Sequence, residues 1–199
     1  NTEILIDRAM RAEEAALAIR GITNSEGAEA DWGEATVCVI GTNGFSETYS
    51  GSHCSLSTSV LAGDGTEMER DYEYTSAVYG DDMMSPEEVG RGAGEKAIKR
   101  LNPRKIESTQ VPIVYDPRVS CGIIGHLSNA INGSSISRET SFLKNKMGQK
   151  IFPENITIYD EPHRLRGLRS KPFDDEGDEN KKRKVVENGV LTTWILDLR

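Results

Sequence analysis

Apolar residues recur at helical spacing in the first twenty residues of the chain. The repeat predicts an amphipathic helix over residues 2–20, with Glu and Arg on its other face and Gly21 at its end. The positions of its apolar face are Leu5, Ala9, Ala12, Ala16 and Ile19.

A second helix is predicted from its start signal. Ser85 suits the capping position, Pro86 suits the first helical position, and the Glu88 carboxylate can reach back to the cap amide. Asn102-Pro103 ends this helix. Its apolar face consists of Val89, Ala93, Ala97 and Leu101.

Between these two helices the pattern changes to short β-prone runs separated by turn residues. Connections this short favour an antiparallel meander. Two helices packed on such a sheet predict an α+β first module. The runs are Ala35 to Ile40, Phe45 to Ser50, Cys54 to Leu61 and Tyr72 to Tyr79, with breaks at Thr42-Asn43-Gly44 and Gly63-Asp64-Gly65.

The second half of the chain predicts the start of a mixed, mainly β module. Asp116-Pro117 begins a buried helix over Val119 to Ser135, and residues 134–150, which are polar and poorly periodic, indicate a mobile loop. The Asn188-Gly189 pair suits a type I′ turn. The predicted strands are Val111 to Tyr115, Asn155 to Tyr159, the two arms of a hairpin over Val185 to Leu191, and Trp194 to Leu196.

Charge is unevenly distributed between the two halves. Residues 1–104 hold 19 acids and 9 bases, whereas residues 105–199 hold 13 acids and 15 bases. This difference predicts two modules, 1–104 and 105–199. Because the chain starts without Met and stops after an apolar run, we expect it to be a fragment of a longer protein.

The totals exclude several classes of protein. A formal net charge of -8 argues against nonspecific nucleic-acid binding and against an anionic membrane surface. No apolar run approaches the roughly 20 residues of a membrane helix, and no signal-peptide pattern is present. The odd number of widely spaced cysteines, Cys38, Cys54 and Cys121, fits a reducing compartment. A soluble cytoplasmic protein is therefore expected.

Two sequence patterns that suggest chemistry are better explained by structure. The glycine-rich run from Gly90 to Lys96 lies inside a predicted helix and lacks the Gly-Lys-Ser/Thr of a phosphate loop, so we interpret it as close packing of that helix against the sheet. His53 and Cys54 are neighbours on a strand and point to opposite faces, so they do not form a nucleophile pair.

His126 and His163 are the remaining candidates for chemistry. His126 is flanked at four-residue spacing by Gly122 and Ala130, so no two-histidine metal site is encoded there. His163 lies in a predicted turn beside Asp160 and Glu161, which favours a structural or surface role. The acidic run Phe173 to Gly177 and the basic run Lys181 to Lys184 are interpreted as a solvated charged loop.

Several stretches in chain order resemble one family, the TldD/TldE proteins, also called PmbA or modulator of DNA gyrase. Together the six span nearly the whole chain, and Gly125-His126-Leu127 points to the TldE (PmbA) branch. The six are Ile22 to Ala28, Met68 to Thr75, Leu101 to Lys105, Ile124 to Leu127, Lys171 to Gly177, and Glu187 to Leu191.

The resemblance implies a cytoplasmic peptidase complex. In this family the TldD subunit carries a zinc helix of the form His-Glu-x-x-x-His, the TldE subunit pairs with it, and the complex trims unfolded or modified peptides. Flanking residues place Gly125 at the first histidine of that motif, His126 at the glutamate and Ala130 at the second histidine. Both ligands are absent, so no zinc or other cofactor is expected in this chain and zinc is expected only in a TldD-type partner.

Three functions follow as hypotheses. The first is a noncatalytic partner subunit that binds a TldD-type chain and meets peptides through the complex. The second is a stand-alone hydrolase that uses His126, His163, Asp174, Asp175 and Glu176. The third is a regulator that binds gyrase directly. We favour an indirect effect on gyrase instead, through the trimming of a peptide. No catalytic residue is predicted, and the predicted binding residues are His126, Gly133, His163, Asp174 and Glu176.

Overall fold

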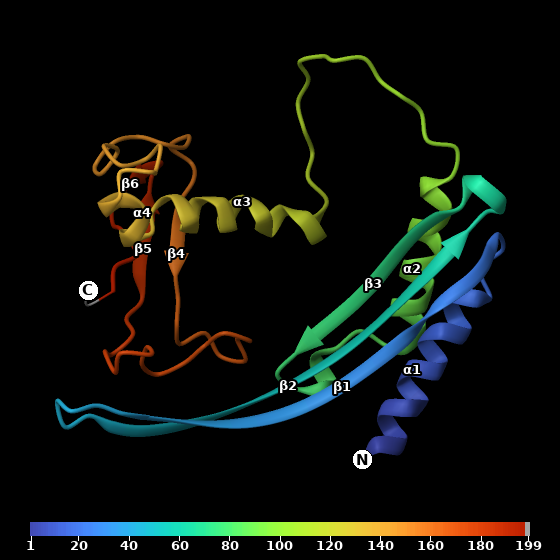
Figure 1. The fold of residues 1–199 in the computed structure, drawn as a ribbon, viewed down its shortest axis with the longest axis horizontal. Helices are drawn as coiled ribbons and strands as arrows, with labels where there is room; N and C mark the ends of the chain where they lie inside the picture. Colours follow the sequence, from blue (N-terminus) through green and yellow to red (C-terminus); the bar gives the residue numbers. More distant parts are fainter. Residues whose placement is uncertain (198–199) are drawn as a thin grey trace. The chain divides into compact units, whose positions relative to one another are not determined.

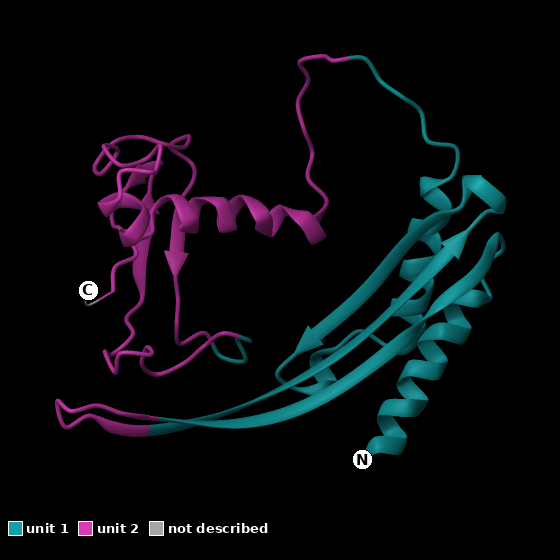
Figure 2. Cartoon of the chain, in the orientation of Figure 1, with its two compact units in different colours: residues 1–38, 48–107, 165–168 teal, residues 39–47, 108–164, 169–199 magenta. Residues whose placement is uncertain are grey.

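The computed structural model describes residues 1–197 and confirms an α+β fold with two three-stranded antiparallel sheets (Figure 1). The chain divides into two units, drawn in different colours in Figure 2. The first unit contains Asn1–Cys38, Thr48–Glu107 and Leu165–Leu168; the second contains Val39–Glu47, Ser108–Arg164 and the chain from Arg169 onward.

In the first unit a sheet of order β1-β2-β3 is covered on one face by two helices, α1 and α2 (Figure 1). Alternate residues of β2 from Cys54 to Ala62 are buried toward the helices, because successive side chains on a strand point to opposite faces. The elements are α1 (Thr2–Leu17), β1 (Ile22–Ile40), β2 (Ser46–Ala62), β3 (Glu69–Ala77) and α2 (Pro86–Arg100), with short 3₁₀ turns at Gly65–Glu67 and Gly80–Asp82.

The predicted helix from Ser85 is confirmed with its capping box. The Ser85 hydroxyl accepts the Glu88 amide at 3.3 Å, and the Glu88 carboxylate accepts the Ser85 amide at 2.9 Å. The glycines of this helix allow close packing, but mainly on α1 rather than on the sheet. A Cβ at Gly90 would lie 2.1 Å from the Ala12 carbonyl oxygen.

The first strand is much longer than the sequence predicts. It begins at Ile22 rather than at Ala35, because residues 22–34 include three Glu, two Gly, one Asn and one Asp, which have low β propensity and obscure the alternation. Within this stretch Ala28 and Ala30 still point into the core. The first helix ends at Leu17 rather than at residue 20.

The second unit contains two helices, α3 and α4, and a small sheet of order β4-β5-β6. Its core includes Leu127, Ile131, Val186 and Leu191, with the last three fully buried. The elements are α3 (Pro117–Ala130), α4 (Gly133–Ser137), β4 (Ile158–Asp160), β5 (Arg183–Glu187) and β6 (Val190–Leu191).

The Asn-Gly hairpin of this unit is confirmed. Glu187 pairs with Val190, so the loop between them is the two-residue Asn188-Gly189. Both loop residues have positive φ, 49° and 81°, as a type I′ turn requires. The second arm of the hairpin, β6, ends at Leu191 as predicted.

Several predictions for the second unit are wrong. Val111 to Tyr115 forms no strand, and the 119–135 helix divides at Ile131 into α3 and α4, with most of α3 exposed rather than buried. Trp194 to Leu196 forms no strand either; only Ile195 makes a bridge, which is parallel, to Asn132.

The stretch from residue 134 to 150 is anchored rather than a mobile loop. It begins within α4, and Leu143 is buried in the core of the second unit. The Ser141 hydroxyl donates to the Ala130 carbonyl at 2.5 Å and accepts the Leu143 amide at 3.0 Å. The predicted strand at Asn155 to Tyr159 is displaced to Ile158–Asp160.

No helix within the part of the chain that the structure describes has the length and apolar character needed to cross a membrane.

Candidate functional site

Helix α3 carries the histidine that the sequence singles out. Asp116 starts the helix by accepting the Arg118 amide at 2.9 Å, and Pro117 occupies the first turn. At the other end, Leu127 and Ala130 are buried in the core of the second unit. The C-terminal part of the helix is thus held by packing.

The three positions of the zinc motif have different surroundings on α3. Gly125 is exposed, and a Cβ built there would meet no atom within 4 Å. His126 is also exposed, and no hydrogen bond or ion pair joins its imidazole to any residue within 1–197. Ala130 is buried in the core and presents only a methyl group.

These residues do not fit the zinc ion that the family resemblance implies. Structural and catalytic zinc sites need at least three protein ligands from His, Cys, Asp or Glu. His126 supplies the one such donor among the three positions, and no group of three potential ligand side chains occurs among the described residues. No chemical step through a metal is therefore assigned to this chain.

Gly133, a predicted binding residue, is a close-packing position. Its amide donates to the Ile195 carbonyl at 2.7 Å, and a Cβ there would lie 2.9 Å from a Leu196 methyl carbon. Asn132 caps the short helix that follows by accepting the Ser134 amide at 3.0 Å. The tight approach of Gly133 to Leu196 accounts for the lack of a side chain at this position.

Asp174 and Glu176 lie in a tight acidic turn. One oxygen of the Asp174 carboxylate accepts the backbone amides of Glu176 and Asp178, each at 2.9 Å. Gly177 has φ +85°, a conformation that other residues rarely adopt. Phe173 is buried beneath the turn and packs edge-on against Phe45, with ring centroids 5.1 Å apart. The Asp174 carboxylate therefore shapes the turn.

His163 is exposed and forms no ion pair with any residue within 1–197. The neighbouring acids are paired with the basic run instead. Lys182 lies 2.8 Å from Glu161, and Arg183 lies 3.1 Å from Asp160. The remaining two bases of the run, Lys181 and Lys184, pair with Glu179 and Glu187.

The predicted residues do not form one catalytic constellation within the described chain. Neither histidine is hydrogen-bonded to a carboxylate of the acidic turn, and Asp175 forms a 2.7 Å ion pair with Lys171. A general acid and base must reach hydrogen-bonding distance directly or through one water molecule. The geometry gives the stand-alone hydrolase no support.

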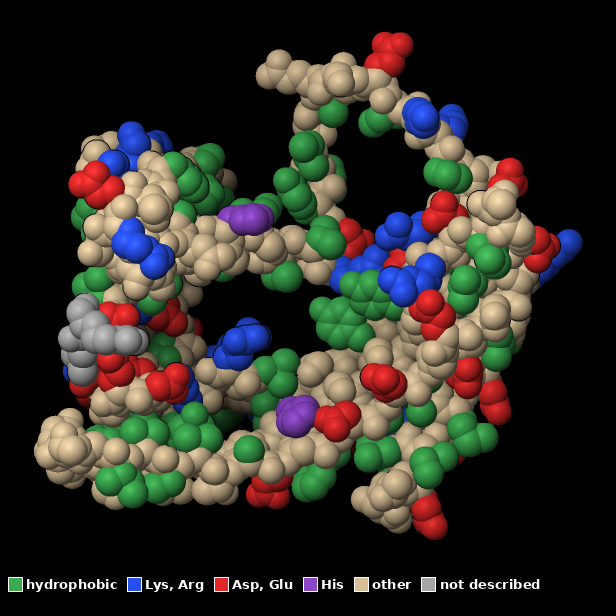
Figure 3. All heavy atoms as spheres, viewed as in Figure 1, with side chains coloured by type: hydrophobic (Ala, Val, Ile, Leu, Met, Phe, Trp, Pro, Cys, Tyr) green, Lys and Arg blue, Asp and Glu red, His purple; other side chains and the backbone are tan. Residues whose placement is uncertain are grey.

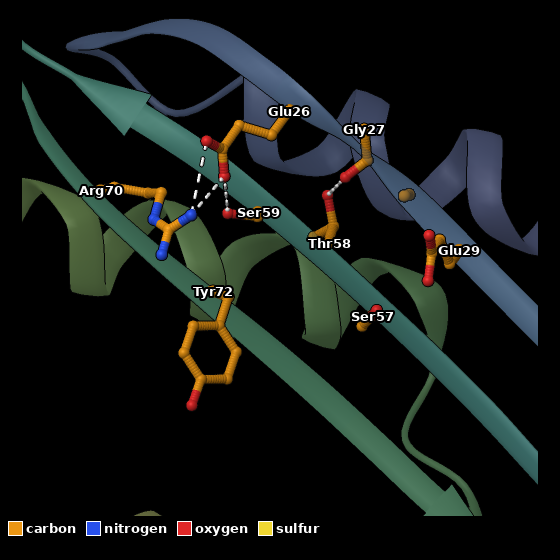
Figure 4. Close-up of a pocket in the computed structure, with 9 residues that line it drawn as sticks. Glu26, Gly27, Glu29, Ser57, Thr58, Ser59, Arg70 and Tyr72 are labelled. Carbon is orange, nitrogen blue, oxygen red and sulfur yellow. Dashed lines mark hydrogen bonds and ion pairs between the residues drawn. The ribbon is translucent and has the colours of Figure 1, made fainter.

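A shallow polar depression of about 500 Å³, which the sequence does not predict, lies on the open face of the first unit's sheet (Figure 4). Glu26 lines the depression, and its carboxylate accepts the Ser59 hydroxyl at 2.7 Å and lies 3.2 Å from Arg70. Both contacts lower the pKa of Glu26, and the hydrogen bond from the Ser59 hydroxyl is the larger cause. The alternation of Arg70, Tyr72 and Tyr74 along β3 is the signal that places them on this face.

The tyrosines add an aromatic strip to this polar face. Tyr72 and Tyr74 stack with ring centroids 6.2 Å apart, and both are about half exposed. Their cross-strand partners on β2 are Ser59 and Ser57. The carboxylate, hydroxyl and guanidinium groups that line the depression can hydrogen-bond a polar ligand.

Comparison with known families and proteins gives matches over nearly the entire chain. The family model for the PmbA/TldA metallopeptidase central domain matches residues 1–101, and the model for the C-terminal domain of the same family matches residues 108–199. The metalloprotease PmbA of Escherichia coli O157:H7 is 38% identical over 192 residues, which cover 96% of this chain and 43% of that protein.

A PmbA homolog from Haemophilus influenzae is 39% identical over 189 residues, covering 94% of this chain and 42% of that protein. The chain thus spans less than half the length of these curated relatives. Among solved structures, a Bacteroides thetaiotaomicron protein named for modulation of DNA gyrase superposes with a TM-score of 0.93 at 30% identity, covering 99% of this chain and 45% of that one. TldE from Thermococcus kodakarensis shares the fold, with a TM-score of 0.80 at 21% identity and coverage of 99% and 45%.

Proposed function

The chain belongs to the PmbA/TldA metallopeptidase family, and we propose that it is part of a partner subunit, without zinc of its own, in a cytoplasmic complex that trims unfolded or modified peptides. The zinc and the hydrolytic chemistry come from a TldD-type subunit in this proposal. This chain contributes binding surfaces.

One observation carries the proposal, the set of side chains on α3. At the positions where the family resemblance expects two histidine ligands, the chain has Gly125 and Ala130. Ala130 is packed in the core and its methyl group offers no donor atom to a metal. With glycine and alanine at the two ligand positions, His126 alone does not hold a metal ion that would generate hydroxide.

The proposal predicts the metal content of the full-length protein. After purification without chelators, elemental analysis should find zinc far below one atom per chain, and unfolded peptides should not be cleaved. Adding a TldD-type subunit should restore cleavage. One tightly bound zinc per chain of the isolated protein would contradict the proposal, as would cleavage that persists without the partner.

The proposal also predicts a stable complex with a TldD-type subunit. The two full-length proteins should elute together in size-exclusion chromatography, whereas independent elution at micromolar concentration would count against partnership. Exposed positions on α3 offer a local test. We expect His126→Ala to weaken the complex without changing the unfolding midpoint of the isolated protein, and Asn129→Ala, an exposed change on the same helix, serves as the matched control.

The name of the Bacteroides protein refers to modulation of DNA gyrase. We propose that any effect of this chain on gyrase is indirect. Trimming of a peptide that acts on gyrase would alter gyrase behaviour without direct contact. The net charge of -10 over residues 1–104 is ordinary for a soluble domain, and nothing in the sequence places these carboxylates at phosphate spacing. Saturable binding of purified gyrase to the isolated protein would favour a direct regulator instead.

A further inference from the structure

Strand β1 breaks its alternation of faces at Gly27. Ala28 and Ala30 pack against the core beneath the helices, so a regular strand would turn Glu26 toward that core as well. The Glu26 carboxylate instead accepts the Ser59 hydroxyl on the open face of the sheet (Figure 4). Gly27 has φ +105°, and a glycine with positive φ at such a break forms a β-bulge. The bulge therefore brings Glu26 onto the open face.

Two side chains hold this bulge in place. The Ser25 hydroxyl accepts the Gly27 amide at 2.9 Å, and the Thr58 hydroxyl donates to the Gly27 carbonyl at 3.1 Å. Thr58 is only 2% exposed, so the second bond ties the bulge to the interior of the sheet. Bulges are common next to functional sites, where they re-aim a side chain. Beyond the bulge the alternation resumes, and Glu29 lines the depression together with Glu26.

The depression carries one negative charge that its own lining does not balance. Glu26 lies 3.2 Å from Arg70, so the charges of these two side chains offset each other. Glu29 lines the same depression, and within residues 1–197 no hydrogen bond or ion pair occupies its carboxylate. An open carboxylate in a depression of about 500 Å³ suits a ligand that carries hydrogen-bond donors and a positive charge.

The aromatic side of the depression suits the same kind of ligand. Tyr72 lines the depression and stacks on Tyr74, and the two residues are 44% and 48% exposed. Tyrosine rings attract cations to their faces, and long basic side chains lay their methylene stems along such apolar surface. Ser57 and Ser59 of the central strand, β2, lie between the carboxylates of β1 and the tyrosines of β3. The lining thus matches both parts of a lysine or arginine side chain.

The open face consists of side chains that are stable in water. Serines and carboxylates are polar and tyrosines are amphipathic, so the depression needs no further polypeptide to cover it. The surrounding charge favours a cation too. Residues 1–104 carry a net charge of -10, and acidic side chains, drawn in red, are distributed over the visible face of the first unit in Figure 3. A negative surface raises the local concentration of a cationic ligand.

We infer that this depression binds a lysine or arginine side chain of an unfolded peptide, with Glu29 accepting the charged group and Tyr72 packing on its stem. The choice of a peptide as the carrier of the cation rests on the proposed function, whereas the cation site rests on the lining of the depression. Through this site the subunit without zinc selects basic peptides for the complex.

Peptide binding to the isolated full-length protein, without a TldD-type subunit, tests the site. Three fluorescein-labelled, unstructured peptides that differ only in one central residue, Lys, Leu or Glu, are titrated and followed by fluorescence anisotropy. We expect the Lys peptide to bind about 10-fold more tightly than the Glu peptide, and added salt to narrow the difference. Equal affinities of the three peptides, or no binding of any of them at millimolar concentration, would overturn the inference.

Two substitutions of one residue locate the cation. Glu29→Gln keeps the shape of the side chain but removes its charge, and should weaken binding of the Lys peptide at least about 3-fold. Glu29→Lys should reverse the preference, so that the Glu peptide binds more tightly than the Lys peptide. Glu34→Gln, at an exposed position of the same strand outside the depression, is the matched control and should leave the affinities unchanged. Equal losses in Glu29→Gln and Glu34→Gln would indicate general attraction by an acidic surface and would overturn the inference.

Cleavage by the assembled complex separates this inference from the proposed function. If both are right, Glu29→Gln raises KM for a Lys-containing peptide and leaves kcat unchanged. Selective binding of the Lys peptide to the isolated protein, without cleavage by the complex, would contradict the proposed function and leave the site in place. Cleavage with the same KM in the parent and Glu29→Gln complexes would contradict the site and leave the proposed function in place.

Discussion

Arg100, at the end of α2, points its Nε atom at the Asp71 carboxylate on β3, with 2.5 Å between the two atoms. Asp71 is 4% exposed, whereas about half of the Arg100 side chain is exposed. The ion pair therefore joins a buried acid on the sheet to a base that retains access to water. Beside it, Lys96 of the same helix pairs with Glu73 of the same strand.

Loss of Arg100 should destabilise the first unit more than loss of an unpaired base nearby. Arg100→Ala removes a positive charge that pairs with the buried Asp71 carboxylate, which we expect to cost about 2–3 kcal/mol, below the range for fully buried pairs because Arg100 is half exposed. Lys99→Ala, one residue away, should change the free energy of unfolding by less than about 0.5 kcal/mol. Urea unfolding followed by circular dichroism measures both; equal effects would mean that the ion pair contributes little.

The capping box of α2 predicts an acid-sensitive contribution to stability. Hydrogen bonds from the Ser85 amide and then from the Ser85 hydroxyl lower the pKa of Glu88 in the folded protein. A carboxylate with a lowered folded pKa stabilises the fold above its unfolded pKa, and that stabilisation is lost as the pH falls through the folded pKa. Ser85→Ala should cost about 1 kcal/mol at pH 7 and less at pH 3.

Unfolding curves of the Ser85 variant and the parent protein at the two pH values measure this difference. If Ser85→Ala lowered the free energy of unfolding equally at pH 7 and pH 3, the ionised Glu88 carboxylate would not stabilise the helix through the capping box. Glu95→Gln, on the exposed surface of the same helix, controls for the general effect of removing one negative charge from α2.

The elements that could be predicted from the sequence are those with strong local signals. The α2 helix has Ser85 and Glu88 at its cap, and the hairpin of the second unit has Asn188-Gly189 at its turn, and both are confirmed. Local backbone chemistry alone determines these features. The start of β1 at Ile22 was missed because its polar, glycine-containing sequence forms a strand only through pairing with β2.

The candidate site could be predicted only in part, because the surroundings of its residues depend on segments that are far apart in the sequence. The placement of Gly125, His126 and Ala130 on one helix follows from sequence periodicity, but their burial depends on distant segments that pack against α3. The polar depression around Glu26 was missed because it brings together three strands. The convergence of Glu26, Ser59 and Arg70 depends on strand register, which no single stretch of sequence specifies.

The Glu26 contacts predict a measurable change in acid titration. The Ser59 hydroxyl is the largest cause of the lowered Glu26 pKa, and Arg70 adds its charge. Ser59→Ala and Arg70→Met should each raise the Glu26 pKa toward its ordinary value, and only the Arg70 contribution should weaken with added salt. Carbon-detected NMR titration of the side-chain carboxyl groups measures this. An unchanged Glu26 pKa in both variants would exclude these contacts in solution.

Two helix glycines predict opposite effects of the same substitution. At Gly90 a Cβ would lie 2.1 Å from the Ala12 carbonyl oxygen, so Gly90→Ala must separate α1 from α2 and should destabilise the first unit by about 2–3 kcal/mol. At Gly122 on α3 a Cβ would meet no atom within 4 Å, so Gly122→Ala should stabilise by about 0.5–1 kcal/mol through helix propensity. Thermal and urea unfolding of both variants distinguish packing from propensity. If Gly90→Ala were neutral, α1 and α2 would not be in the close contact described, whereas a destabilising Gly122→Ala would indicate that this face of α3 is covered in the protein tested.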